Sequence, residues 1–446
     1  MSVAPHLGWG GIVRLALVQS ALGAIIVLTT STMNRVMVVE LALPAMVPGV
    51  LVALHHVVQL LRPRLGHGSD VGGRRTPWIV GGMAVLALGG IGAALATAWM
   101  ATDRAAGLLL GVAAFVAIGI GAGAAGTSLL VLLAKRVDPE RRAAAATIAW
   151  VMMIAGFIVT SALAGRFLDP FSPARLVEVT CCVALVAFVV ALLAVRGIEG
   201  AGVTAEPGEV QASGSFRAAL AEVWQQAPAR RFTIFVFVSM LAYSMQDLIV
   251  EPFAGLVFGY TPGQSTQLSG LQNGGVLLGM ALIGIVGTLR RRAGDTSMRG
   301  FTIAGCLASA LALVGLVAGG LVGPGWPLRP TVFLLGVANG AFAVSAIGSM
   351  MALAGAGHDG REGVRMGLWG AAQAIAFAAG GVVGTGLFDL ARPLLGPPTH
   401  AYTTVFAIEA LVFVISARMA AHVSDVAPQR ATRPAPQELR YLKVAE

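Results

Sequence analysis

Long runs of apolar residues, separated by short polar segments, repeat along the whole chain. Each run has about 18 residues or more, enough for a helix that rises 1.5 Å per residue to cross roughly 30 Å of hydrocarbon. The expected spans cover residues 12–33, 44–61, 78–100, 105–134, 143–165, 176–195, 232–258, 268–289, 300–322, 331–354, 366–388 and 401–421. The pattern therefore predicts an all-α polytopic membrane protein with twelve transmembrane helices and both termini on one side.

Composition excludes a soluble globular protein. Of the 446 residues, 57% are apolar and only 11% are charged, and the mean hydropathy is +0.81. A soluble protein of this size needs far more charge on its surface. The basic residues lie in short clusters between apolar runs rather than in one stripe, so we expect no nucleic-acid partner despite a sequence pI near 10.4.

The distribution of charge predicts the orientation. Of the 30 Lys and Arg residues, 24 fall in the N-terminal segment, the connections that follow even-numbered spans, and the C-terminal segment. The other six fall on the opposite side. Because cytoplasmic segments are enriched in Lys and Arg, both termini are expected in the cytoplasm.

The longest internal polar stretch divides the chain into two halves. We expect a six-helix bundle over 1–196, a cytoplasmic linker over 197–229, a second six-helix bundle over 230–423 and a disordered cytoplasmic tail over 424–446. Within the linker, residues 215–226 have amphipathic spacing, which favours either a helix on the membrane surface or a simple tether.

The two halves carry similar polar motifs at matching places. The string NRVMVVE at 34–40 ends the first span, and QDLIVE at 246–251 occurs late in the seventh. Repetition of this kind is typical of duplicated transporter-like bundles. In a two-fold arrangement the first and seventh spans face one another, so we expect Arg35 and Asp247 to form an ion pair. The alternative is that Arg35, like Glu40, anchors the end of the first span and that Asp247 independently binds a proton or a ligand.

The loop between the second and third spans has a turn motif with charges. Its sequence GHGSDVGGRR at 66–75 places Gly66 and Gly73 at turns and Asp70 where it can pair with Arg74 or Arg75. Thr76 and Pro77 suit the start of the next helix. The pattern resembles the loop motif of the major facilitator superfamily, in which it latches the two halves together. A merely basic, orienting loop is the alternative.

The chain contains the strings TMNRVMVVEL at 32–41, ALHH at 53–56, GRRTPWI at 73–79 and QDLIVEPFAG at 246–255. These strings resemble those of the PucC family, the bacteriochlorophyll-delivery branch of the major facilitator superfamily in photosynthetic bacteria. RLALVQ at 14–19 and the 66–79 loop are most similar to the LhaA branch, tied to assembly of the core light-harvesting ring. The resemblance implies a factor that assembles antenna polypeptides with bacteriochlorophyll in a cytoplasmic or intracytoplasmic membrane.

The same resemblance sets the expected partners. These are light-harvesting antenna polypeptides, the reaction-centre core, pigment-synthesis or membrane-insertion machinery, and membrane lipids. Bacteriochlorophyll is the implied cofactor, and no carotenoid or particular lipid is specified.

Ionisable residues inside apolar spans are costly and are therefore candidates for function. Asp247 and Glu251 lie four residues apart on one helix face, next to Gln246, and are candidates for binding a proton or a polar group of a pigment. Glu409 in the last span is a further candidate. The alternative for all three carboxyl groups is a solvated or paired position near a helix end.

His55 and His56 lie near the middle of the second span. A neutral imidazole is a good axial ligand for the magnesium of a chlorophyll, so either residue is a candidate metal ligand. Adjacent helical residues point about 100° apart, so at most one should face a central site. The alternative is a hydrogen bond between helices.

The sequence lacks a Ser-His-Asp arrangement, a zinc-ligand spacing and a phosphate loop, so we expect no enzyme and no catalytic residues. The glycine string GAGAAG at 121–126 lies within a span and indicates close helix packing rather than dinucleotide binding. Two functions remain: an assembly factor that handles pigment, and a proton-coupled exporter of a small amphipathic molecule with Asp247 or Glu251 as its proton site.

Overall fold

The computed structural model describes residues 7–61, 74–199, 224–292, 298–355 and 362–422, and every regular element in these ranges is helical. The first half contains α1 (Trp9–Val27), α3 (Met46–Val58), α5 (Thr76–Trp99), α6 (Arg104–Arg136), α7 (Arg142–Phe167) and α8 (Pro173–Val195). The second half contains α10 (Ala227–Gln246), α11 (Val250–Phe258), α12 (Pro262–Arg292), α13 (Arg299–Val322), α14 (Leu328–Gly355), α15 (Glu362–Leu395) and α16 (Pro398–His422). The predicted all-α fold is confirmed.

The chain is a multi-pass membrane protein. Within the described ranges, eleven helices are long and apolar enough to cross a bilayer. The expected second span is shorter: α3 has 13 residues and continues for one turn as η3 (Gln59–Leu61). Its start is delayed by the bend at 41–45, which contains Pro44 and where Ala42 has a positive φ of 48°. Together these elements supply the twelve expected spans.

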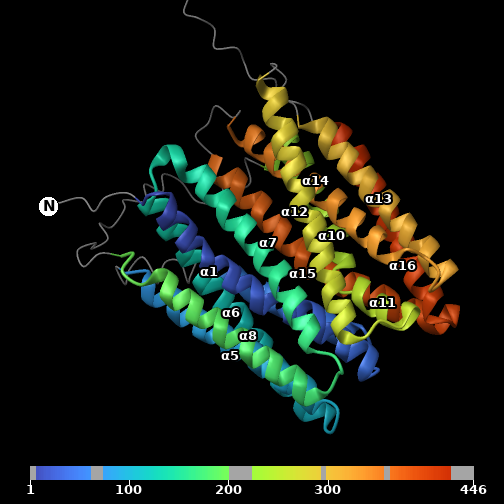
Figure 1. The fold of residues 1–446 in the computed structure, drawn as a ribbon. Helices are drawn as coiled ribbons and strands as arrows, with labels where there is room; N and C mark the ends of the chain where they lie inside the picture. Colours follow the sequence, from blue (N-terminus) through green and yellow to red (C-terminus); the bar gives the residue numbers. More distant parts are fainter. Residues whose placement is uncertain (1–6, 62–73, 200–223, 293–297, 356–361, 423–446) are drawn as a thin grey trace, which may run out of the picture.

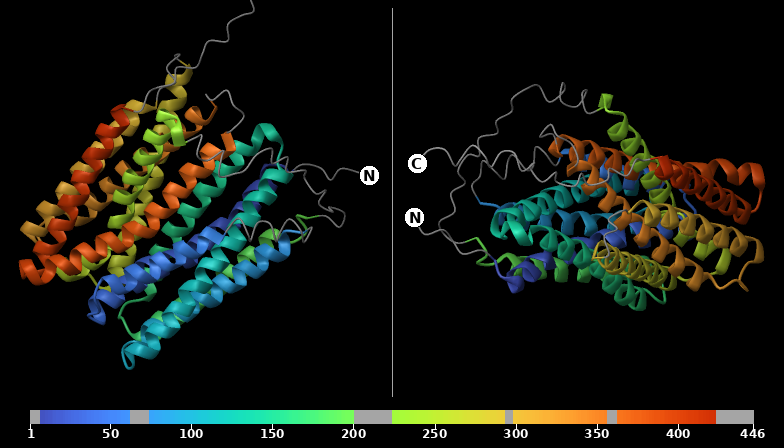
Figure 2. Two further views of the ribbon diagram at one scale, coloured as in Figure 1. Left: turned by 180° about the vertical axis from the view of Figure 1, so that it is seen from behind. Right: turned by 90° about the horizontal axis from the view of Figure 1, so that it is seen from above.

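Two bundles of helices lie side by side, one from each half of the chain (Figure 1). Each has its own hydrophobic core, and the two cores have almost no residues from the opposite half. The bundles meet where α3 packs on α15 and α7 packs on α12. The same division is visible from behind (Figure 2, left). Most of the expected linker lies outside the described residues, including residues 215–223 of its amphipathic segment. The expected tail also lies outside them.

Polar contacts join the bundles at the end where the first span terminates, called here the Glu40 end. Asp389 near the end of α15 accepts hydrogen bonds from the backbone N–H groups of Ala45 (3.0 Å) and Met46 (2.8 Å), at the start of α3. Asp169, just after α7, accepts from Thr261 Oγ1 (2.6 Å) at the start of α12. In each case a carboxylate from the fifth span of one half holds the start of the second span of the other.

Close packing between α5 and α6 depends on glycine. A Cβ on Gly121 would lie 2.4 Å from the backbone nitrogen of Leu86 and 2.6 Å from the carbonyl oxygen of Gly82. Any side chain at this position would force the two backbones apart. The GAGAAG string is thus a packing motif, as the sequence predicted.

A carboxylate from a distant segment holds the start of α5. Glu199, after α8, accepts hydrogen bonds from the backbone N–H groups of Arg75 (2.7 Å) and Thr76 (2.8 Å). Thr76 is the first helical residue and does not cap the helix, contrary to expectation. Burial raises the pKa of Glu199, but the hydrogen bonds from Thr76 and Arg75 and the charge of Arg74 outweigh it, and the pKa is lowered from its ordinary 4.5.

Candidate functional site

The first span is distorted at the place where the two halves meet. After α1 it continues as a π-helical turn, η1 (Leu28–Thr32), a short α2 (Met33–Arg35) and a second π-helical stretch, η2 (Val36–Glu40). Such π-turns are rare and are frequent at functional sites. The distorted stretch carries a buried row of polar side chains: Ser31, Thr32, Asn34 and Arg35.

The seventh span is broken opposite this row. Residues 247–249 form a turn between α10 and α11. Pro252 in α11 has no N–H, so it cannot donate to the carbonyl of Leu248 four residues earlier. The side chain of Asn34 donates to that carbonyl instead, at 2.9 Å. The break is therefore satisfied by the other half of the chain, as the interior of a membrane protein requires.

Three carboxyl groups lie close to the break. Glu251 is 3% exposed and accepts a hydrogen bond from Ser31 across the two halves. Glu409 on α16 is fully buried, and neither of its oxygens has a hydrogen-bond partner among the described residues. Asp247 lies within electrostatic range of both, and its side chain is exposed. Of the three candidates, Asp247 is the one that a ligand or water can reach.

Arg35 forms a different ion pair from the one that the repeat predicted. The guanidinium is 2% exposed, pairs with Glu40 and donates to the Tyr260 carbonyl at 2.6 Å. Among the described residues it makes no ion pair with Asp247, so that prediction is wrong. The guanidinium packs over Gly255, where a Cβ would lie 3.0 Å from Nη2. Glycine at this place leaves the room that Arg35 needs to reach the seventh span.

The two histidines point to different neighbours. His55 is 2% exposed, and its Nδ1 lies 3.0 Å from the Val52 carbonyl. His56 is half-buried, with its ring 5.9 Å from that of Phe377 on α15. Phe377 in turn contacts Tyr243, which lies within electrostatic range of Asp247. His56 thus faces the opposite half, whereas His55 lies too deep for a large ligand to reach.

A groove of about 970 Å³ lies between α1, α7 and α8 of the first half. Small residues, including Ala21, Ala24 and Gly156, form part of its wall. Branched apolar side chains stand at its edges, among them Val159 (56% exposed) and Val186 (62%). Its polar residues are near the Glu40 end: Ser20 apart, these are chiefly Arg166, Asp169, Arg175, Glu178 and Cys182. This groove could accommodate a large, flat, mainly apolar ligand.

Sequence reasoning missed several residues of these sites. Ser31 and Thr32 carry no charge, yet Ser31 binds Glu251, and the Thr32 hydroxyl lies 2.9 Å from that of Thr266. Asp169 and Asp389 lie near span ends, where acidic residues are common and are not candidates for function on the sequence alone. Of the predicted loop residues, Arg74 is exposed and Arg75 is buried. Gly66, Asp70 and Gly73 lie outside the described residues.

The chain is similar to known proteins in its sequence and in its fold. Residues 32–427 match the profile of the family described as PUCC protein. A Rhodobacter capsulatus protein named "Bacteriochlorophyll synthase 44.5 kDa chain" is 52% identical over 94% of this chain and 96% of its own length. "Protein PucC" of the same organism is 28% identical over 91% of this chain and 90% of its own.

Solved transporters share the fold. A POT family transporter crystallised with a thioalcohol-conjugated peptide superposes with a TM-score of 0.70, covering 94% of this chain and 99% of its own, at 12% identity. A D-xylose–proton symporter gives a TM-score of 0.65, covering 91% and 97%, at 15% identity. At such identities the likeness concerns the fold and not the substrate.

Proposed function

This chain belongs to the PucC family, and on that premise we propose that it is an assembly factor of the photosynthetic apparatus. It holds bacteriochlorophyll and delivers it to nascent light-harvesting polypeptides, those of the core antenna ring in particular. It works in the cytoplasmic or intracytoplasmic membrane with both termini in the cytoplasm. The family name and the pigment in the name of the 52% identical relative support a role in this pathway.

The observation that carries the proposal is the groove between α1, α7 and α8. Its volume of about 970 Å³ is at the upper end of the range for small-molecule sites. A mainly apolar wall suits a tetrapyrrole with its hydrocarbon tail, and the small residues let a flat ring approach the helices. Glu178 contributes a carboxylate, and Mg²⁺ prefers oxygen ligands of this kind. A site on the outside of a bundle also allows transfer to a neighbouring antenna helix without passage through the protein.

Pigment content of the protein purified from its pigmented host tests the groove. We expect Val159→Trp and Val186→Trp to fill the groove and lower bound pigment several-fold. Leu311→Trp, at a position on α13 that is 72% exposed, is the matched control and should leave it unchanged. Loss of pigment in His56→Phe with retention in both groove variants would instead support magnesium ligation by a histidine in the interior.

Deletion in the host tests the role itself. Assembled core antenna should fall while bacteriochlorophyll synthesis continues, because the factor is proposed to act after synthesis. If synthesis stopped in the deletion strain, the enzymatic role suggested by the word synthase in the relative's name would be favoured. Co-purification of antenna polypeptides is expected in the wild type.

Proton-coupled export of a small amphipathic molecule is the second candidate. Three carboxyl groups around one helix break favour it, because reachable Asp247 lies within electrostatic range of buried Glu251 and Glu409. On this view Asp247→Asn abolishes proton-driven export and the purified protein carries neither pigment nor antenna subunits.

A further inference from the structure

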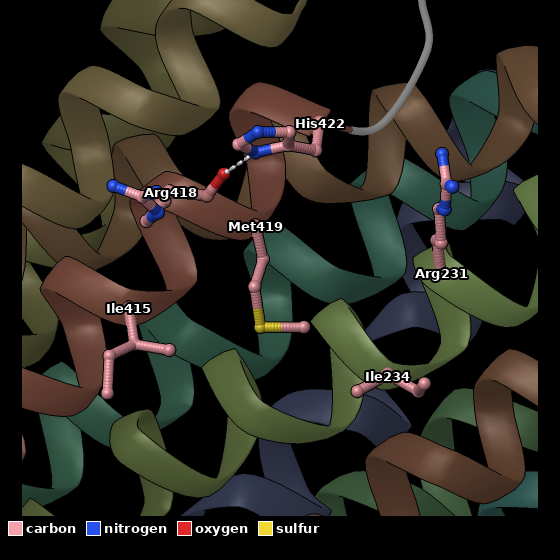
Figure 3. Close-up of a pocket in the computed structure, with 6 residues that line it drawn as sticks. All are labelled: Arg231, Ile234, Ile415, Arg418, Met419 and His422. Carbon is pink, nitrogen blue, oxygen red and sulfur yellow. Dashed lines mark hydrogen bonds between the residues drawn. The ribbon is translucent and has the colours of Figure 1, made fainter.

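A second pocket lies between α10 and α16, at the end of the bundle opposite the Glu40 end. Its volume is about 420 Å³. Figure 3 shows the residues that line it, two from the first turns of α10 and four from the last turns of α16: Arg231, Ile234, Ile415, Arg418, Met419 and His422. It is separate from both the groove and the carboxyl groups described above.

The rim of the pocket is positively charged. Arg231 and Arg418 are exposed and come from different helices, and their guanidinium groups have no hydrogen-bond or ion-pair partner within the part of the chain that the structure describes. His422 Nδ1 lies 2.7 Å from the Arg418 carbonyl oxygen (Figure 3). Since a carbonyl only accepts, Nδ1 donates to it, and Nε2 remains for another contact. None of the six lining residues is acidic, so an anion is the complementary ligand.

The deeper part of the pocket is apolar. Ile234 lies about one helical turn from Arg231, and Ile415 about one turn from Arg418, in both cases toward the middle of the bundle. Their exposed fractions are 42% and 44%. Met419 lies between the two helices, and its flexible thioether can adapt to a chain of methylene groups (Figure 3). The cationic rim therefore matches the charged head group of an anionic phospholipid, and the apolar side chains below it match the start of an acyl chain.

We propose that this pocket binds an anionic phospholipid, with its phosphate on Arg231 and Arg418 and the start of one acyl chain on Ile234, Ile415 and Met419. Basic pockets between helices at a cytoplasmic membrane surface bind acidic lipid head groups. The excess of Lys and Arg at this end of the spans favours the cytoplasmic leaflet as the source. The proposal goes beyond the assembly function and does not depend on pigment binding.

Native mass spectrometry of the full-length protein in mild detergent tests the site. Delipidated protein is titrated with phosphatidylglycerol or phosphatidylcholine, which differ in net head-group charge. We expect the wild type to prefer phosphatidylglycerol, and Arg231→Gln with Arg418→Gln to weaken its binding on the order of thirtyfold, from the loss of two arginine contributions. Arg230→Gln is the matched control, because this exposed neighbour does not line the pocket.

Two further experiments distinguish a lipid phosphate from free phosphate and separate the site from general charge effects. Met419→Trp should block the acyl chain and lower lipid binding while leaving the arginines in place. The basic residues beyond His422 are present in every variant and so contribute equally. Equal binding of the two lipids, an equal loss in Arg230→Gln, or full displacement by millimolar inorganic phosphate would each overturn the proposal, the last in favour of a free-phosphate site.

Discussion

A single amide side chain allows a proline to remain inside the seventh span. Pro252 leaves the Leu248 carbonyl without its helical donor, and Asn34 supplies one from the other half of the chain. Without Asn34 the carbonyl would be buried and unpaired, which costs about 1 to 3 kcal/mol. We expect Asn34→Ala to lower the free energy of unfolding by that amount, measured by denaturant titration in detergent.

A second substitution isolates this cause. Pro252→Ala restores an N–H that can donate to Leu248, so Asn34→Ala should cost clearly less in the Pro252→Ala background. If Asn34→Ala cost the same in both backgrounds, the amide would stabilise the protein through some other contact.

Arg35 gives a prediction about charge pairing. Because its partner is Glu40, a double-mutant cycle with Arg35→Ala and Glu40→Ala should show a coupling of more than about 1 kcal/mol. The cycle with Asp247→Ala should show no more than about 0.5 kcal/mol. Exchange of the two charges, Arg35→Asp with Asp247→Arg, should then restore neither accumulation nor stability, whereas such a rescue would support the pairing that the repeat suggested.

At the scale of elements, the start of α5 depends on a carboxylate brought from beyond α8. The lowered pKa of Glu199 means that its ionised form is favoured in the folded protein. Its contribution to stability is therefore present above its ordinary pKa of 4.5 and is lost as the pH falls through the lowered value. We expect Glu199→Gln to lower stability by about 1 kcal/mol at pH 7.

The pH dependence provides the control for this prediction. The difference between Glu199→Gln and the wild type should shrink as the pH falls from 4.5 through the lowered pKa of Glu199, and it should vanish once both side chains are uncharged. A difference that stays constant from pH 7 down to pH 3 would show that the effect comes from packing and not from the charge of Glu199.

The spans could be predicted from the sequence, whereas most contacts between them could not. Span lengths depend on local apolar composition, which can be seen directly in the sequence. The glycines of α6 form a local motif as well, so their role in close helix packing could also be predicted. Ser31 and Glu251 lie 220 positions apart, and only the packing of the two halves brings them together. The repeat correctly located the polar stretches of the first and seventh spans, but a motif match carries no information about side-chain direction, so it assigned Arg35 the wrong partner.

At the scale of the whole molecule, Asp169 and Asp389 close the Glu40 end in a pseudo-symmetric way. Each holds a helix start of the opposite half. Replacing both by Ala should favour separation of the bundles at this end by about 2 kcal/mol, roughly a thirtyfold change in population. Labelling of Thr266→Cys, a fully buried position, in an otherwise cysteine-free protein should become correspondingly faster.

The matched control is the same cysteine in the presence of both aspartates, so that the loss of the Thr32–Thr266 contact is common to all samples. Single replacements should give intermediate rates. An unchanged labelling rate in the double variant would mean that apolar packing alone keeps this end closed.

The contact of Asp389 with the start of α3 also has a consequence for biosynthesis. Asp389 lies 343 residues after Met46, so a ribosome adding about 5 to 20 residues per second makes it about 20 to 70 seconds later. Throughout that interval the newly inserted α3 lacks the carboxylate that holds its first turn in the finished protein. The first half is therefore in the membrane without its Asp389 contact until almost the whole chain has been translated.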